Sequence, residues 1–167
     1  EEISESLGKI SSIIDLGSGV NGFSYPLISE NFGNVNYLGV EASGQIVEQV
    51  NNYFVENNFE GNAICEDLFD MKNILIKMKL MKKPRVVFMF QLIDALESLK
   101  KNFSKEFILK ISSECEFIVL TFSLESLSGR KRFSSERKWL IDFLSDEFDI
   151  LKDFKMFGER VLIFRKK

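Results

Sequence analysis

A short apolar run that ends directly in a glycine-rich stretch constrains the fold of this chain more than any other feature. Residues 11–16 read SSIIDL, and residues 17–22 read GSGVNG, which matches the pattern G-x-G-x-x-G. A buried strand followed by such a loop and then by a helix is the start of a βαβ unit, in which backbone N–H groups approach a ligand closely. The spacing alone is compatible with a dinucleotide and with any other ligand that contains adenosine.

The rest of the chain alternates between strand-like and helix-like segments. The expected strands are Ser11–Leu16, Val35–Val40, Asn62–Cys65, Arg85–Phe90 and Glu116–Phe122. The expected helices are Phe23–Phe32, Ser43–Asn58 with Ser43 as N-cap, Asn73–Met81, Ile93–Leu99, Lys105–Ser112 and Ser134–Leu144. The last segment divides at Gly158-Glu159 into two strand-like halves, which predicts a hairpin. We therefore expect an α/β fold with a Rossmann-like doubly wound sheet of about seven strands, mostly parallel with a C-terminal antiparallel hairpin, in one domain over residues 1–167.

Composition argues against a metal site and against a membrane segment. The chain has no histidine, and its two cysteines, Cys65 and Cys115, stand alone, so we expect no zinc or other metal site. Lone cysteines are typical of core residues in a reducing compartment. The sequence also has no signal-peptide pattern and no apolar run of about 18 residues. These features predict a cytoplasmic protein.

The charged residues are distributed unevenly along the chain. Residues 1–70 contain one lysine and twelve acidic residues, whereas residues 71–128 contain ten basic and six acidic residues, and residues 129–167 contain eleven basic and seven acidic residues. The net charge of −3 argues weakly against nucleic-acid binding. The asymmetry is nevertheless able to give one face a positive potential, although scattered solvated lysines would produce the same counts.

Three features favour S-adenosylmethionine over a dinucleotide as the ligand. Asp15 lies two residues before Gly17, where a carboxylate repels a pyrophosphate but attracts the ammonium and sulfonium groups of S-adenosylmethionine. Asp67 follows the third strand, where it is placed to accept a hydrogen bond from the adenine amino group. The expected terminal hairpin also differs from the separate substrate domain that a dehydrogenase normally needs. Glu41, at the end of the second strand, is suited to the ribose hydroxyls of either ligand.

The ordered set DLGSG, VEAS and CEDLF, together with the terminal hairpin, resembles the class I S-adenosylmethionine-dependent methyltransferases over essentially the whole chain. The resemblance implies a methyltransferase that uses S-adenosylmethionine as its cofactor. The residues that it implies for the cofactor site are Asp15, Gly17, Ser18, Gly19, Asn21, Glu41, Ala42, Asp67, Leu68 and Gln91.

Each part of the cofactor is assigned to a part of this set. The resemblance places Asp15, Gly17 and Gly19 at the methionine end and Glu41 at the ribose. It also places Asp67 and Leu68 around the adenine and Gln91 near the methyl group. The third glycine of the loop, Gly22, is interpreted as incidental.

A longer stretch points to a more specific family. Residues 121–144, TFSLESLSGRKRFSSERKWLIDFL, resemble the S-L-G-G-R segment and following helix of the 16S ribosomal RNA (guanine-N7) methyltransferases that confer aminoglycoside resistance. Asn21, Tyr37 and the stretch FMFQLIDALESL have counterparts in that family. Glu41 and Gln91 depart from it, because the family prefers Asp and a Lys or His-like residue there. The family also carries a large helical domain before its first strand, whereas ten residues precede that strand here.

The chemistry implied for the substrate needs no base. The motif D/N-P-P-Y/F of exocyclic-amine methyltransferases is absent after the fourth strand, where the sequence reads FQLI. A ring nitrogen such as guanine N7 has a free lone pair, so positioning supplies most of the catalysis and no catalytic residue is assigned.

The resemblance implies ribosomal RNA or the small ribosomal subunit as the partner. The residues that it implies for the substrate are Ser126, Arg130, Lys131 and Arg132. With Arg137 and Lys138, the last three form a basic cluster suited to phosphates. Phe122, Phe133 and Trp139 are either base-stacking or core residues, and the apolar helix face places Trp139 in the core.

Two other functions remain open from the sequence. The first is a methyltransferase that acts on a small molecule or a protein, which predicts an enclosed apolar pocket and substrate binding that does not depend on salt. The second is a degenerate, non-catalytic RNA-binding domain, which predicts no affinity for the cofactor.

Overall fold

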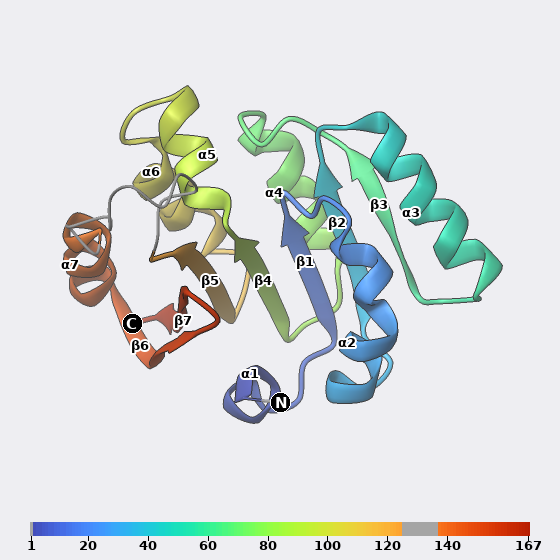
Figure 1. Cartoon of the computed structure of the whole chain (residues 1–167), viewed down its shortest axis with the longest axis horizontal. Coiled ribbons are helices and arrows are strands. Elements are labelled where there is room, and N and C mark those ends of the chain that lie inside the picture. Colours follow the sequence, from blue (N-terminus) through green and yellow to red (C-terminus); the bar gives the residue numbers. More distant parts are fainter. Residues whose placement is uncertain (1, 125–136) are drawn as a thin grey trace.

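The computed structural model describes residues 2–124 and 137–167, which form one seven-stranded sheet flanked by helices (Figure 1). The strands are β1 (Ser12–Leu16), β2 (Asn36–Glu41), β3 (Gly61–Cys65), β4 (Arg85–Phe90), β5 (Phe117–Ser123), β6 (Phe148–Met156) and β7 (Glu159–Lys166). Their order across the sheet is β3-β2-β1-β4-β5-β7-β6. The first five pair in parallel, and β7 runs antiparallel to both β5 and β6. The predicted Rossmann-like sheet with an antiparallel hairpin is therefore confirmed.

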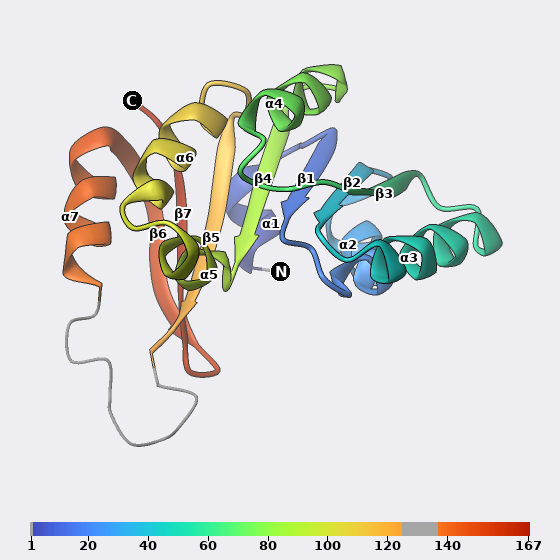
Figure 2. The ribbon, with the colours of Figure 1, turned by 90° about the horizontal axis from the view of Figure 1, so that it is seen from above.

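Helices cover both faces of the sheet (Figures 1 and 2). They are α1 (Glu2–Leu7), the 3₁₀ helix η1 (Asn21–Ser24), α2 (Tyr25–Phe32), α3 (Gly44–Glu56), α4 (Met71–Leu80), α5 (Leu92–Leu99), α6 (Phe103–Ile111) and α7 (Lys138–Glu147). One apolar cluster packs α4, α5, α6 and α7 on one face, and a second packs α1, α2 and α3 on the other. The apolar runs of β1 and β4 are buried almost throughout because both faces are covered.

The two faces differ in the side chains that fill them. The α2–α3 face is richer in aromatic rings: Tyr25, Tyr37, Phe54 and Phe59 form tilted, edge-on and stacked pairs with centroids 5.0–6.2 Å apart. The opposite face is mostly aliphatic, with leucines, isoleucines and methionines from its four helices. The phenylalanine-rich composition is thus used largely as core.

The observed elements differ from the expected ones in a few places. Helix α1 has no counterpart among the expected elements, because it is a six-residue segment that buries Leu7 alone. Helix α4 begins at Met71, since the Asp70 side chain accepts a hydrogen bond from Asn73 N and caps it. Helix α7 continues to Glu147, beyond the expected end at Leu144, and residues 134–136 of the expected helix lie outside the described part.

The prediction for the start of α3 is only partly right. Ser43 occupies the N-cap position, but its side chain makes no capping hydrogen bond. Its backbone N–H instead donates to Glu41 Oε1. None of the helices in the described part of the chain has the length and apolar character needed to span a bilayer.

Candidate cofactor and substrate site

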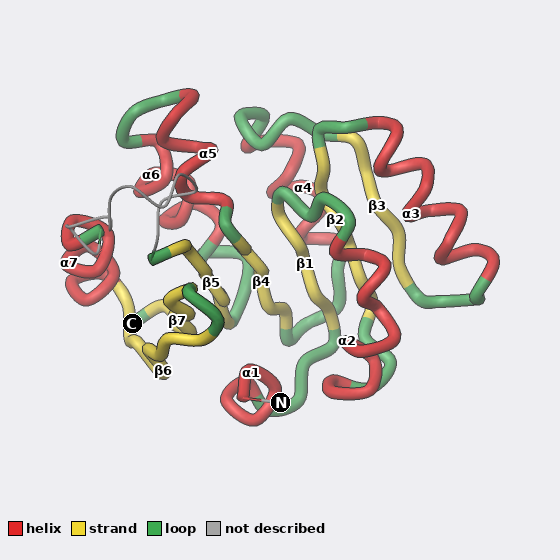
Figure 3. Tube along the Cα trace, in the orientation of Figure 1, coloured by secondary structure: helices red, strands yellow, loops and turns green. Residues whose placement is uncertain are grey.

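The predicted site residues gather where the parallel strands end. β1 lies between β2 and β4, and the chain leaves β1 toward one side of the sheet and β4 toward the other. This is the switch point at which open α/β sheets bind ligands, outside the carboxyl ends of the strands. The loops that follow β1, β2, β3 and β4 lie along this same edge (Figure 3). We call it the carboxyl edge.

The glycine loop after β1 is held against the end of β2. Gly17 N and Ser18 N both donate to Val40 O, at 2.8 and 3.0 Å. Gly17 and Gly19 have φ values of +69° and +49°, which other residues rarely adopt. A Cβ on Gly17 would also lie 2.9 Å from Leu92 Cδ1 of α5. The loop therefore needs glycine at both positions.

Gly22 is not incidental, contrary to the sequence interpretation. A Cβ at this position would lie 2.6 Å from Val50 Cγ1 on α3 and 3.5 Å from Phe54 Cε2. The third glycine therefore lets η1 pack closely on α3. This is a role in helix packing that the G-x-G-x-x-G pattern also serves in dinucleotide folds.

Asp15 lies beneath this loop and binds two neighbouring side chains. Its Oδ2 accepts hydrogen bonds from Asn21 Nδ2 and from Tyr37 Oη, both at 2.7 Å. The Asp15 side chain is 1% exposed. The carboxylate therefore fixes the positions of Asn21 and Tyr37. The sequence suggested only that Asp15 attracts the cationic end of the cofactor, and did not indicate this structural role.

Burial controls the ionisation of this cluster. Desolvation raises the pKa of Asp15 from 3.8 to about 6, and the hydrogen bonds from Asn21 and Tyr37 oppose that rise. Burial, followed by the charge of Asp15, raises the pKa of the Tyr37 hydroxyl well above its ordinary value. Tyr37 therefore stays protonated and donates, and Asp15 carries a negative charge at neutral pH.

Glu41 joins the glycine loop to the loop after β2. Its Oε2 accepts from Gly19 N at 3.0 Å, and its Oε1 accepts from Ser43 N at 2.9 Å. The side chain is half-buried. Each carboxylate oxygen can accept more than one hydrogen bond, so this fixed carboxylate retains the capacity to accept from a ligand.

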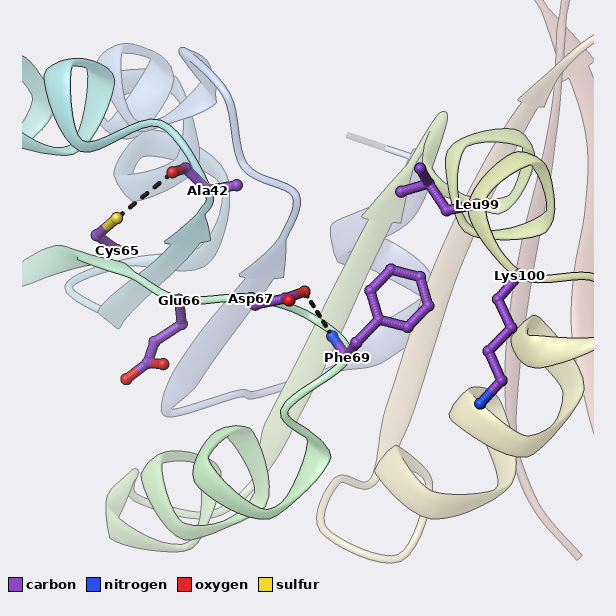
Figure 4. A pocket seen from close by; sticks show the side chains of 7 residues that line it. All are labelled: Ala42, Cys65, Glu66, Asp67, Phe69, Leu99 and Lys100. Atoms are coloured by element: carbon purple, nitrogen blue, oxygen red, sulfur yellow. Dashed lines mark hydrogen bonds between the residues drawn. The ribbon is translucent and has the colours of Figure 1, made fainter.

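A cavity of about 740 Å³ opens at the ends of β2 and β3 (Figure 4). It is lined by Ala42, Cys65, Glu66, Asp67, Phe69, Leu99 and Lys100. Cys65 Sγ donates to Ala42 O at 3.4 Å, which holds the two strand ends together. The structure thus brings the predicted residues Ala42 and Asp67 to one cavity.

The segment after β3 is shaped by an Asp turn. Asp67 Oδ1 accepts from Phe69 N at 2.9 Å, and the rest of the exposed carboxylate faces solvent. Leu68 and Phe69 both pack against the apolar cluster under α4 to α7. Phe69 also lines the cavity, with Leu99 as a second large apolar residue, whereas Leu68 is not among the lining residues.

Gln91 lies at the carboxyl end of β4, as predicted. Its backbone has a φ of +55°, and its N–H lies within hydrogen-bond distance of both Thr121 O and Thr121 Oγ1. Its side chain is exposed at the N-terminus of α5. Left-handed backbone at a non-glycine residue is a form of local strain that gathers at functional sites.

Arg137 is not part of a phosphate-binding surface, contrary to the sequence prediction. Its side chain is almost completely buried, with Nε 2.9 Å from Asp94 Oδ1 and Nη2 bonded to Asp94 Oδ2. Nη1 donates to Ser123 O at 2.8 Å, and the guanidinium lies 4.6 Å from the centroid of the Phe122 ring. Arg137 therefore ties the start of α7 to α5 and to the end of β5.

The other predicted substrate residues fall partly outside the described chain. Ser126, Arg130, Lys131 and Arg132, and the aromatic Phe133, lie in 125–136. Phe122 is core, since its side chain is 1% exposed.

Trp139 is assigned to the core by the sequence, but its side chain is 38% exposed. It lies in the first turn of α7, with Lys105 Nζ 5.5 Å from its ring centroid. The core assignment of Trp139 is therefore wrong, because Leu140 and Leu144 are the residues that α7 buries.

Sequence reasoning did not assign five of the cavity residues to the site: Cys65, Glu66, Phe69, Leu99 and Lys100. Phe69 follows Asp67 within CEDLFD, so the Asp turn was a usable signal. Leu99 and Lys100 come from the end of α5, and only the folded arrangement brings them opposite β3 (Figure 4).

The fold resembles those of several solved methyltransferases. The 16S rRNA methyltransferase RmtF, solved with S-adenosyl-L-homocysteine, superposes with a TM-score of 0.72 at 21% identity, over 99% of this chain and 59% of that chain. The 16S rRNA methylase ArmA gives a TM-score of 0.71 at 17% identity, over 99% of this chain and 79% of that one. A SAM-dependent methyltransferase from Aquifex aeolicus gives 0.64 at 12% identity, over 98% and 87% of the two chains.

These comparisons establish the fold and leave the activity open. No protein-family model matches the sequence, and no curated protein matches it. This chain spans less than two thirds of the length of RmtF. The strand order, the terminal hairpin and the superpositions together show that this chain has the Rossmann-like α/β fold of class I S-adenosylmethionine-dependent methyltransferases, a group that includes 16S rRNA methylases.

Proposed function

We propose that this chain, acting as a single domain over residues 1–167, binds S-adenosylmethionine at the carboxyl edge and transfers its methyl group to ribosomal RNA. The observation that carries the proposal is the Glu41 carboxylate, held at the switch point by Gly19 N and Ser43 N. An acid fixed beside a glycine loop is the arrangement that holds ribose hydroxyls in this type of fold.

The residues at the edge fit the three parts of this cofactor. Asp15 supplies negative charge beneath the loop, which favours the cationic methionine end over a pyrophosphate. Glu41 accepts from the ribose, and the cavity of Ala42, Asp67 and Phe69 takes the adenine against its apolar wall. The methionine end of the cofactor is proposed to lie against the glycine loop, at Gly17, Ser18, Gly19 and Asn21.

The proposed acceptor is a ring nitrogen, and guanine N7 is the form that the sequence resemblance favours. The bound S-adenosylmethionine supplies an electrophilic methyl group on a sulfonium. The nitrogen lone pair forms the new C–N bond while the C–S bond breaks, its electron pair stays on sulfur, and the product base carries the positive charge. No proton leaves, so the reaction needs no base. Gln91, exposed at the end of β4, is placed to orient the incoming base.

Two observations support RNA as the substrate class. The stretch after β5 contains Arg130, Lys131 and Arg132 within a segment that resembles the 16S rRNA guanine-N7 methyltransferases. Solved structures with the same fold include 16S rRNA methylases. Ser126 and these three cations are the proposed substrate contacts.

The test is transfer of labelled methyl from S-adenosylmethionine to three acceptors: small ribosomal subunits, naked ribosomal RNA and a protein extract. The account predicts label on RNA, lost in Glu41→Ala and retained in Glu48→Ala, an exposed acid on α3. Nuclease digestion then identifies the methylated base. If only protein or small molecules become labelled, the substrate class is not RNA and is the labelled material instead. RNA binding with neither cofactor binding nor methyl transfer would favour the non-catalytic RNA-binding alternative.

A further inference from the structure

The turn between β6 and β7 presents an unusual residue to solvent. Phe157 is 95% exposed, the largest exposed fraction among the large apolar residues of the described chain. It is followed by Gly158, and the two have φ values of +50° and +79°. Positive φ at both central residues is the pattern of a type I′ hairpin turn, in which the first position favours Asn, Asp or Gly. A bulky phenylalanine there is strained and gains nothing from burial.

The same turn lies at the carboxyl edge of the sheet. β7 begins beside the end of β5, with Ser123 opposite Glu159. Leu124 N donates to Gly158 O at 2.8 Å, which fixes the turn to the chain as it leaves β5. Figure 2 shows the hairpin turn extending past the end of β4, toward the side on which the parallel strands end. Phe157 is therefore on the side where a methyl acceptor approaches.

We propose that Phe157 is a substrate-binding residue that stacks on a nucleobase next to the methylated nucleotide. The inference rests on the proposed RNA substrate and names one contact of that same site. A base drawn toward a methyl donor leaves its own stack, and an aromatic ring at the rim replaces part of the lost stacking. An exposed phenyl ring suits any base because every base has a π-face.

The surroundings of the turn favour a base over a protein surface. Lys155 and Arg160 lie opposite each other in the hairpin, and the Arg160 guanidinium is bonded to Asp153. With Glu159 beside them, the local charge is mixed and gives no strong field for phosphate. The neighbouring apolar side chain is Met156, which is 42% exposed. One ring and one thioether match the area of a single base and are far smaller than a protein-binding patch.

The decisive variant is Phe157→Asn. Asn-Gly is the preferred type I′ sequence, so this hairpin is expected to be at least as stable as the original. The dissociation constant for naked small-subunit RNA is expected to rise about tenfold, since aromatic stacking contributes at this level. Phe157→Trp is expected to retain affinity. The matched control is Leu80→Asn, which changes another exposed apolar residue at the end of α4, before β4 begins on the opposite edge.

Salt and cofactor titrations separate this contact from other effects. Stacking releases no counterions, so the slope of log K against log salt is expected to be equal in wild type and Phe157→Asn. Affinity for S-adenosylhomocysteine is expected to be unchanged. If the wild type binds and methylates RNA and Phe157→Asn does so equally well, this inference is overturned. The proposed function would still stand. A wild type that binds S-adenosylhomocysteine and no RNA would overturn both.

Discussion

Gly19 and Glu41 are 22 residues apart in the chain, yet the backbone N–H of Gly19 donates a 3.0 Å hydrogen bond to Glu41 Oε2. The same carboxylate accepts from Ser43 N through Oε1. One side chain thus sets the position of the glycine loop relative to the start of α3. The acid proposed to accept from the ribose is therefore also the link between these two loops.

Removal of this link is expected to weaken the folded state. Glu41→Ala deletes two hydrogen bonds from backbone N–H groups to a carboxylate, and we expect the free energy of unfolding to fall by about 1–3 kcal/mol. Urea unfolding followed by circular dichroism measures this change. Glu48→Ala, on the exposed side of α3, is the control and is expected to shift stability by less than about 0.5 kcal/mol. Equal stability of the two variants would show that the loop does not depend on Glu41.

Asp15 is expected to make stability depend on pH. Its pKa is raised from 3.8 to about 6 in the folded state, so the folded protein binds the proton more tightly than the unfolded chain. Its contribution to stability is therefore complete below about pH 4 and is lost as pH rises to about 6, by about 3 kcal/mol. Asp15→Asn removes this titration.

A comparison of Asp15→Asn with the wild type isolates the contribution of Asp15 to the pH dependence of stability. The amide introduced by Asp15→Asn retains a side-chain oxygen that accepts from Tyr37, and the variant is expected to gain stability relative to wild type between pH 4 and pH 7. Urea titrations at several pH values measure the difference. Asp142→Asn, at an exposed site on α7, is expected to show no such trend. A constant difference between Asp15→Asn and wild type across this range would contradict the buried carboxylate.

The Arg137–Asp94 pair is expected to stabilise the contact of α7 with α5 and the end of β5. Asp94→Ala removes the carboxylate that binds Nε and Nη2 of a buried guanidinium, and we expect a loss of about 1–3 kcal/mol. A double-mutant cycle with Arg137→Ala measures the coupling. The exposed pair Arg165–Asp149 serves as the reference and is expected to couple by less than about 1 kcal/mol. Similar coupling energies in both pairs would mean that burial of Arg137 does not strengthen its interaction with Asp94.

Gly22→Ala is expected to destabilise the protein by about 1–3 kcal/mol, because the new methyl group would lie 2.6 Å from Val50 Cγ1. Val50→Ala removes the clashing atoms, so the double variant is expected to lose less stability than the sum of the two single changes. Thermal unfolding of all four proteins measures this coupling. Gly44→Ala is the control, since its Cβ would meet only Cys65 Sγ at 3.9 Å. Additive effects of Gly22→Ala and Val50→Ala on stability would show that η1 shifts away from α3 and avoids the clash with Val50.

Much of the fold was predictable because its central strands are short, mostly apolar runs. SSIIDL and RVVFMF are too short and too apolar to be surface helices, and glycine or polar residues end each of them. The terminal hairpin followed from Gly158. Helix α1 was missed because six residues carry no periodicity, and its position depends on contacts with residues distant in sequence.

The positions of the candidate site residues were predictable where these residues follow strand ends, and unpredictable where they depend on packing. Glu41 and Asp67 were found from their positions after apolar runs. Lys100 was missed because nothing in its local sequence connects it with β3. Arg137 was misread because a cation among other cations looks solvated, and only the fold shows that Asp94 lies beside it.

The most direct test of the account is a calorimetric titration of S-adenosylmethionine into wild type, Glu41→Ala and Glu48→Ala. The account predicts one binding site in the wild type, affinity at least about tenfold weaker in Glu41→Ala, since hydrogen bonds to a charged group contribute this much, and no change in Glu48→Ala. Absence of binding to the wild type, or equal affinity in all three proteins, would contradict the claim that the carboxyl edge of this sheet is a cofactor site.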